Sequence, residues 1–70
     1  MKIHLIGNHI LSTRTNAIHL DETEIWYFEY SPTLTTKENL ILLGFIDKKD
    51  LPKNVVKVVI PKNRIEKITL

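Results

Sequence analysis

The chain has no cysteine, and only two glycines and three prolines occur among its 70 residues. Without cysteine it can form neither a disulfide nor a thiolate metal site, and this composition suits a reducing cytosol. With only Gly7 and Gly44, it lacks the glycine-rich loop that cradles phosphate groups. A chain this short buries little apolar surface, so we expect a single domain, residues 1–70, with a thin margin of stability.

Long hydrophobic runs are also absent. The longest apolar segment, LILLGFI at residues 40–46, is far shorter than the about 20 residues of a membrane-spanning helix. The apolar stretch near the N-terminus is interrupted by His4, Asn8 and His9, which is a poor match to a signal peptide. We therefore expect a cytoplasmic protein that does not contact a membrane.

Charge of one sign does not dominate. Ten Lys and Arg residues face eight Asp and Glu residues, which gives a formal net charge of +2. Most basic residues fall in residues 48–70, whereas residues 21–29 are acidic. A solvated surface of mixed charge explains this balance, and the excess is too small to imply nucleic acid by itself.

What the chain does have is a series of short runs typical of β-strands. β-Branched and aromatic residues are separated by turn residues, which predicts strands at residues 2–6, 9–13, 17–20, 25–31 and 55–60. The pair Gly7-Asn8 predicts a two-residue hairpin with a type II′ turn. The charged residues 21–24 predict another turn.

The segment IWYFEYS at residues 25–31 is the clearest strand, and its two faces differ. Trp26, Phe28 and Tyr30 share one face, and Tyr27 and Glu29 share the other. Because Glu29 marks its face as the one in water, we expect Trp26 and Phe28 in the core and Tyr27 near solvent.

Residues 36–46 are open to two interpretations. Thr35 and Glu38 have the spacing of a helix capping box ahead of an apolar run. Gly44 lies inside that run, and the segment LILLGFID at residues 40–47 is apolar on both faces, which favours a buried strand. We favour the strand, and the helix remains the alternative.

The C-terminal segment VVKVVIPKNRIEKITL at residues 55–70 predicts a strand, a break at Pro61 and a final strand. Val56, Val58 and Ile60 should point inward and Lys57 outward. The three-residue spacing of Ile65 and Ile68 suggests a 3₁₀ turn at residues 61–65, after which Ile68 and Leu70 rejoin the sheet.

This ending resembles the last part of SH3-like and Sm-like barrels in shape, over about 16 residues. We expect an all-β fold with at most one short helix or 3₁₀ turn, in the form of a small antiparallel β-barrel or sandwich. Its core should contain Trp26, Phe28, Leu43, Phe45, Val58 and Ile68.

No pattern of catalytic or metal-binding residues is present. His4, His9 and His19 do not have the spacing of a zinc site, and the serines and threonines lack a nucleophile motif. We therefore expect no enzyme activity, no metal and no cofactor.

The remaining function is binding. We expect a non-enzymatic protein-binding module that works as a regulator, adaptor or inhibitor by stoichiometric contact. A nucleic-acid-binding small β-barrel that uses the basic C-terminal third is the alternative. Edge strands offer a route to a homo-oligomer. The abundance of Lys, Ile and Asn fits an accessory protein of a bacterium, phage or plasmid. The candidate contact residues are Tyr27, Tyr30, Lys48, Lys49, Lys53, Lys62 and Arg64.

Overall fold

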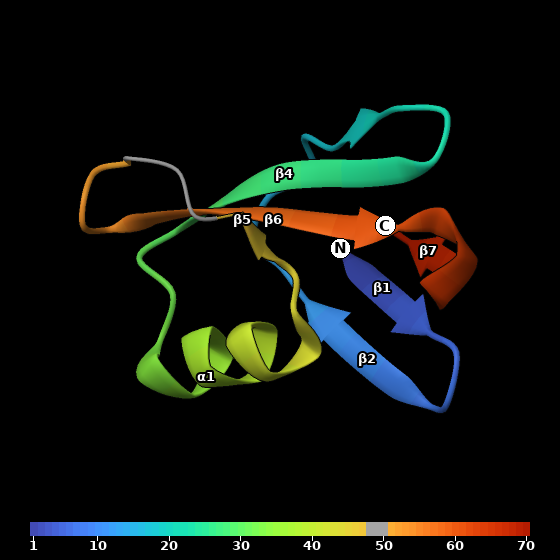
Figure 1. The fold of residues 1–70 in the computed structure, drawn as a ribbon, viewed down its shortest axis with the longest axis horizontal. Coiled ribbons are helices and arrows are strands. Elements are labelled where there is room, and N and C mark those ends of the chain that lie inside the picture. Colours follow the sequence, from blue (N-terminus) through green and yellow to red (C-terminus); the bar gives the residue numbers. More distant parts are fainter. Residues whose placement is uncertain (48–50) are drawn as a thin grey trace.

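Two antiparallel sheets form the greater part of the regular secondary structure of the computed structural model, which describes residues 1–47 and 51–70 (Figure 1). The three-stranded sheet has the order β2-β1-β7, and the four-stranded sheet has the order β3-β4-β6-β5. The strands are β1 (Lys2–Leu5), β2 (His9–Ser12), β3 (His19–Leu20), β4 (Glu24–Tyr30), β5 (Ile46–Asp47), β6 (Val55–Pro61) and β7 (Ile65–Thr69). One helix, α1 (Leu34–Leu43), and one 3₁₀ turn, η1 (Lys62–Arg64), complete the described elements. The expectation of a mostly β fold is confirmed, and the described strands do not close into a barrel.

The first hairpin forms where the sequence predicts it, with a different turn. Leu5 pairs with His9, so the connection from β1 to β2 has three residues, Ile6, Gly7 and Asn8, rather than the expected two. Gly7 and Asn8 have φ angles of 96° and 67°. A type II′ turn has a positive φ at its first central residue only, so the expected type II′ turn does not form here. Glycine and asparagine both tolerate a positive φ, which suits them to this connection.

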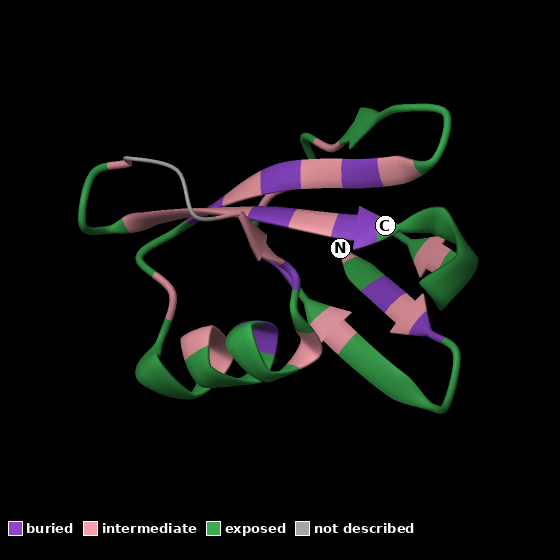
Figure 2. Cartoon of the chain, viewed as in Figure 1, coloured by how far each residue is buried: buried purple, intermediate pink, exposed green. Residues whose placement is uncertain are grey.

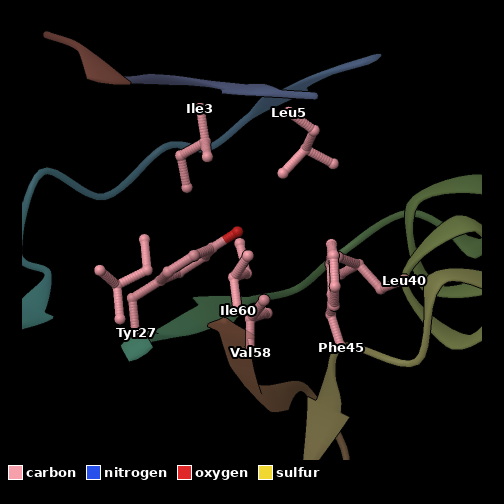
Figure 3. Packing of buried hydrophobic residues seen from close by; sticks show 8 residues of the cluster. Ile3, Leu5, Tyr27, Leu40, Phe45, Val58 and Ile60 are labelled. Carbon is pink, nitrogen blue, oxygen red and sulfur yellow. The ribbon is translucent and has the colours of Figure 1, made fainter. Parts of the chain in front are cut away.

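The core lies between the two sheets (Figure 3). Ile3 and Leu5 of β1 point toward the inner side chains of β4 and β6, and Leu40 and Phe45 extend the cluster toward α1. The buried hydrophobic residues are Ile3, Leu5, Ile25, Tyr27, Leu40, Phe45, Val58 and Ile60. Of the six expected core residues, Phe45 and Val58 are buried, while Leu43 and Ile68 pack against the cluster from partly exposed positions.

The two faces of β4 are the reverse of the expectation. Ile25, Tyr27 and Glu29 are buried, whereas Trp26 and Phe28 are only half-buried. Figure 2 shows this alternation along β4. The prediction that Trp26 and Phe28 fill the core was wrong because it treated a carboxylate as proof of exposure, and Glu29 is buried beside a hydrogen-bond donor instead.

Residues 34–43 form a helix, so the favoured strand was wrong and the alternative is correct. Thr33 is the N-cap, and its side chain accepts a hydrogen bond from the Thr36 N–H at 3.1 Å, so the helix begins before the expected capping box. Gly44, with φ of 77°, ends the helix: its N–H donates to the Ile41 carbonyl, and the Phe45 N–H donates to that of Leu40. This is a Schellman motif, so the glycine that argued against a helix is its terminator.

The expected 3₁₀ turn is confirmed as η1, which carries the chain from β6 in one sheet to β7 in the other. The odd spacing of Ile65 and Ile68 has a separate cause. Ile65 pairs with Leu5 and Ile68 pairs with Ile3, with a register shift between them that skips Glu66. This bulge lets both isoleucines approach the core. The expectation that Leu70 rejoins the sheet was wrong, since β7 ends at Thr69.

The reversed faces of β4 predict the effects of two neighbouring substitutions. Tyr27→Ala should cost about 3–5 kcal/mol, as truncation of a buried aromatic residue does, and should leave the protein largely unfolded. Trp26→Ala should cost about 1–2 kcal/mol, because it loses ring contacts on a half-exposed face rather than core packing. Urea denaturation followed by circular dichroism measures both. A greater loss for Trp26→Ala than for Tyr27→Ala would contradict the assignment.

Candidate functional site

An aromatic stripe runs along the outer face of the four-stranded sheet. The sequence contains five aromatic residues other than histidine, and only Tyr27 and Phe45 are in the core. The other three, Trp26, Phe28 and Tyr30, alternate along β4 and share its outer face. Tyr30 is 59% exposed, and the other two are half-buried. A chain with a small core thus places most of its aromatic side chains outside it.

Neighbouring strands hold the Trp26 indole in place. The His19 imidazole of β3 stacks on it with ring centroids 3.9 Å apart and an interplanar angle of 9°. The Phe28 ring meets it edge-on at 5.6 Å. From β6, the Lys57 ammonium lies 4.4 Å from the indole centroid, within cation–π range. We call the five side chains His19, Trp26, Phe28, Tyr30 and Lys57 the aromatic face.

The strand register explains why these side chains meet. Trp26 pairs with His19 on one side and Val59 on the other, and Phe28 pairs with Lys57. Lys57 in turn pairs with Asp47 of β5, and their side chains form a salt bridge of 3.8 Å. Residues that are directly opposite on one face of an antiparallel sheet are close enough for side-chain contact.

The charge around the aromatic face is mixed. Lys57 is bound by Asp47, and Glu24 lies on the same face of β4 as Trp26. A hollow of about 450 Å³ next to Lys57 is lined by Glu24, Asp47 and Val59, among others. The described part of this face therefore offers two carboxylates and one ammonium, and it is not a basic surface.

The predicted contact residues are scattered. Tyr27 is buried, with 2% of its surface exposed, so the expectation that it lies near solvent was wrong, and it offers almost no surface for contact with a partner. Tyr30, on the face that was expected to enter the core, is exposed and remains a candidate contact residue. Lys53 and Lys62 are exposed at opposite ends of β6, and Arg64, in η1, lies over the Phe45 ring at 5.6 Å. Lys48 and Lys49 lie outside the described residues.

Sequence reasoning missed Trp26 and Phe28 as surface residues, and it did not select His19 or Lys57 as contact residues although it placed Lys57 outward. Trp26 and Phe28 share a face with Tyr30, so the alternation itself was available from the sequence. The signal that could have assigned the faces is Ile25, which is buried and shares the parity of Tyr27 and Glu29. The pairing of His19 and Lys57 with Trp26 depends on strand register, which the sequence does not specify.

A separate, polar site lies at the end of β4, on its inner face. The Thr13 hydroxyl donates to the Glu29 carboxylate Oε2 at 2.7 Å and accepts from the Thr15 N–H at 3.2 Å. Thr13 and Glu29 are each only 7% exposed. They line a hollow of about 240 Å³, which we call the polar pocket, with Ser12, Arg14, Ser31, Pro32, Thr33 and Thr36.

Neither a metal cluster nor a membrane span occurs in the described ranges. No three His, Cys, Asp or Glu side chains in residues 1–47 and 51–70 are placed to hold a metal ion, and the three histidines stay apart. His4 instead hydrogen-bonds the Thr69 hydroxyl at 3.2 Å. The only helix in these ranges, α1, is too short to span a bilayer.

Comparison with known proteins does not supply a function. No protein-family model, no curated protein and no solved structure matches the chain.

The burial of Tyr27 predicts a loss of stability at alkaline pH. Desolvation of the ring, assisted by the charge of Glu29, raises the pKa of the Tyr27 phenol above its ordinary value of about 10. The unfolded chain releases this proton near pH 10 while the folded protein keeps it, so the free energy of unfolding should fall as pH rises above about 10.

Tyr27→Phe removes the ionisable group but keeps the ring. Its urea midpoint should therefore fall less steeply above about pH 10 than that of the unchanged protein, whereas the two should depend on pH similarly near neutrality. Parallel decreases in both proteins would show that Tyr27 is not responsible for the alkaline loss.

Proposed function

We propose that the protein is a small, non-enzymatic protein-binding module that acts as a regulator, adaptor or inhibitor by stoichiometric contact. The observation that supports this function best is the aromatic face, with Tyr30 exposed and two half-exposed rings beside it. Aromatic side chains are enriched in protein interfaces, since they bury a large area at a low cost in conformational entropy.

The contacts within the aromatic face favour binding in a second way. The His19 stack, the Phe28 edge contact and the Lys57 cation–π contact restrict the Trp26 indole before any partner arrives. A side chain that is already ordered loses less conformational entropy on association, so more of the contact energy contributes to affinity.

The same contacts weigh against the nucleic-acid alternative. A base that stacks on Trp26 would compete with His19 for the indole ring. Phosphate groups would meet Glu24 and Asp47 near the only ammonium that the described part of this face contributes. Lys53 and Lys62 lie beyond opposite ends of β6, a strand of about 20 Å in length.

The proposal retains the other expectations from the sequence. A cytoplasmic accessory protein of a bacterium, phage or plasmid is the setting that we propose. The strand, 3₁₀ turn and strand at residues 55–69 support an SH3-like or Sm-like shape as a proposal about the fold.

The test is affinity capture from a lysate of the source cells with three versions of the immobilised protein. The unchanged protein should capture a partner in a stoichiometric amount, and Tyr30→Ala should capture at least about tenfold less, as loss of an interface tyrosine does. Lys67→Ala, an exposed substitution on β7 of the other sheet, is the matched control and should capture the full amount. Equal capture by all three would reject the aromatic face as the contact. Nuclease-sensitive capture would favour nucleic acid.

We also propose that the protein self-associates through β2. This strand is an edge of its sheet, and Ile10 within it is 55% exposed. A hollow of about 330 Å³ beside it is lined by Ile10, Leu42 and Leu43, and Leu42 of α1 is 86% exposed. An unpaired edge beside apolar side chains favours strand pairing between two copies.

Light scattering tests self-association. The unchanged protein should have a mass near twice the 8.2 kDa of one chain at high concentration, and Ile10→Lys should shift it toward 8.2 kDa. Ile6→Lys is the matched control, because Ile6 is equally exposed, at 59%, but lies beyond the end of β1. A single-chain mass for the unchanged protein at all concentrations would contradict the proposal.

A further inference from the structure

Glu29 is a buried carboxylate without a cationic partner among the described residues. It lies on the inner face of β4, in line with Ile25 and Tyr27, and is 93% removed from solvent. Its hydrogen-bond donor is the neutral hydroxyl of Thr13, and the salt bridge found in the described ranges joins Lys57 to Asp47 instead. Acidic side chains are rarely buried unless they are paired, because removing a charge from water is costly.

The two oxygens of the Glu29 carboxylate differ in their surroundings. Oε2 accepts the Thr13 hydrogen bond, and Oε1 has no hydrogen bond in the described part of the protein. In that same part, no fully buried side-chain polar atom lacks a hydrogen-bond partner. Oε1 is therefore accessible to solvent, and the opening that Glu29 lines is the polar pocket.

Hydroxyl groups on the pocket wall add further acceptors. Ser12, Ser31 and Thr36 line it together with Glu29. Ser31 is held in the left-handed region, with φ of 49°, and its N–H donates to the Asn54 carbonyl at 2.6 Å. A carboxylate surrounded by hydroxyl oxygens suits a group with several N–H donors, such as a guanidinium or an ammonium.

The pocket and the aromatic face meet at the same end of β4. Tyr30 follows Glu29 directly, with its side chain on the outer face, and Ser31 of the pocket follows Tyr30. Because these neighbouring residues point to opposite faces, a protein that covers Tyr30 would have to extend around the end of the strand to reach the pocket mouth.

We propose that the polar pocket binds the cationic end of an arginine or lysine side chain supplied by the partner protein, with Glu29 as the receiving carboxylate. This inference rests on the proposed protein-binding function. Arg14 is the cationic residue of the described chain on the pocket wall, and it forms no salt bridge with Glu29. Its like charge opposes the incoming cation, which gives the proposal a second testable consequence.

The experiment is a titration of ¹⁵N-labelled protein, followed by the shifts of its amide resonances. The probes are N-acetyl-arginine amide and N-acetyl-lysine amide, and N-acetyl-citrulline amide is the uncharged control of nearly equal size. At least one cationic probe should cause saturable shifts of the Thr13, Ser31 and Thr36 amides at millimolar concentrations, and the citrulline derivative should not.

Two variants identify the groups involved. Glu29→Gln keeps an acceptor for the Thr13 hydroxyl, and its spectrum should remain that of a folded protein, but it should bind the cationic probe at least about tenfold more weakly. Arg14→Ala should bind it more tightly. The proposal is overturned by an absence of saturable shifts, by equal binding of the citrulline derivative, by unchanged binding to Glu29→Gln, or by weaker binding to Arg14→Ala.

Capture of the partner distinguishes this inference from the function on which it rests. Glu29→Gln should capture less of the partner, as Tyr30→Ala does. If Tyr30→Ala lowers capture and Glu29→Gln does not, the aromatic face is supported as the partner contact. The proposal that the pocket binds a side chain of the partner is then rejected. If the probe binds the pocket but Tyr30→Ala captures the partner normally, the aromatic face is rejected as the partner contact, whereas the pocket is still supported as a cation-binding site.

Discussion

The two-residue period of β4 is the constraint on which the rest of the structure depends. This strand is central in its sheet, so both of its faces have consequences. The inner set, Ile25, Tyr27 and Glu29, fixes the core and the polar pocket, and the outer set fixes the aromatic face. A shift of the register by one residue against β6 would exchange the two faces of β4, so that Trp26 would point into the core toward the sheet that contains β1. Burial of Ile25 and Tyr27 opposes that shift, because it would move both side chains out of the core, and the observed register pairs all seven residues of β4 with β6.

Helix α1 depends on the same core through its last turn. The Schellman motif turns the chain at Gly44, so that Leu40 and Phe45 both enter the buried cluster. Phe45 then leads into β5, and its carbonyl accepts from the Val59 N–H of β6 at 2.7 Å. The glycine thus connects helix capping, core packing and sheet pairing within a few residues. Because no atom lies within 4 Å of the position that a Cβ would occupy at Gly44, its backbone angle rather than lack of space favours glycine there.

Much of the strand layout was predictable from the sequence, because turn residues and β-branched runs act locally. The hairpin at Gly7-Asn8, the strand after Asn54 and the 3₁₀ turn after Pro61 all follow from such local rules. The faces of β4 and the state of residues 34–43 were not predictable in this way, because tertiary contacts decide them. Glu29 is tolerated inside through Thr13, which is sixteen residues distant in sequence. The helix leaves the apolar residues Leu34, Ile41 and Leu42 exposed. Apolar residues therefore lie on all of its faces, and the sequence has the pattern of a strand that is buried on both faces.

The placement of polar and aromatic residues argues for binding more strongly than composition does. A 70-residue domain gains most stability by burying its large apolar side chains, and this one instead keeps Trp26, Phe28 and Tyr30 on an outer face while it buries a carboxylate. Both choices oppose stability in the isolated chain, since exposed rings forgo burial and a buried charge loses hydration. Both would be compensated by one event, the docking of a surface that covers the rings and supplies a cation. Tyr30 and Glu29 are adjacent at one end of β4 but point to opposite faces, so a single partner would have to extend around that end of the strand to meet both.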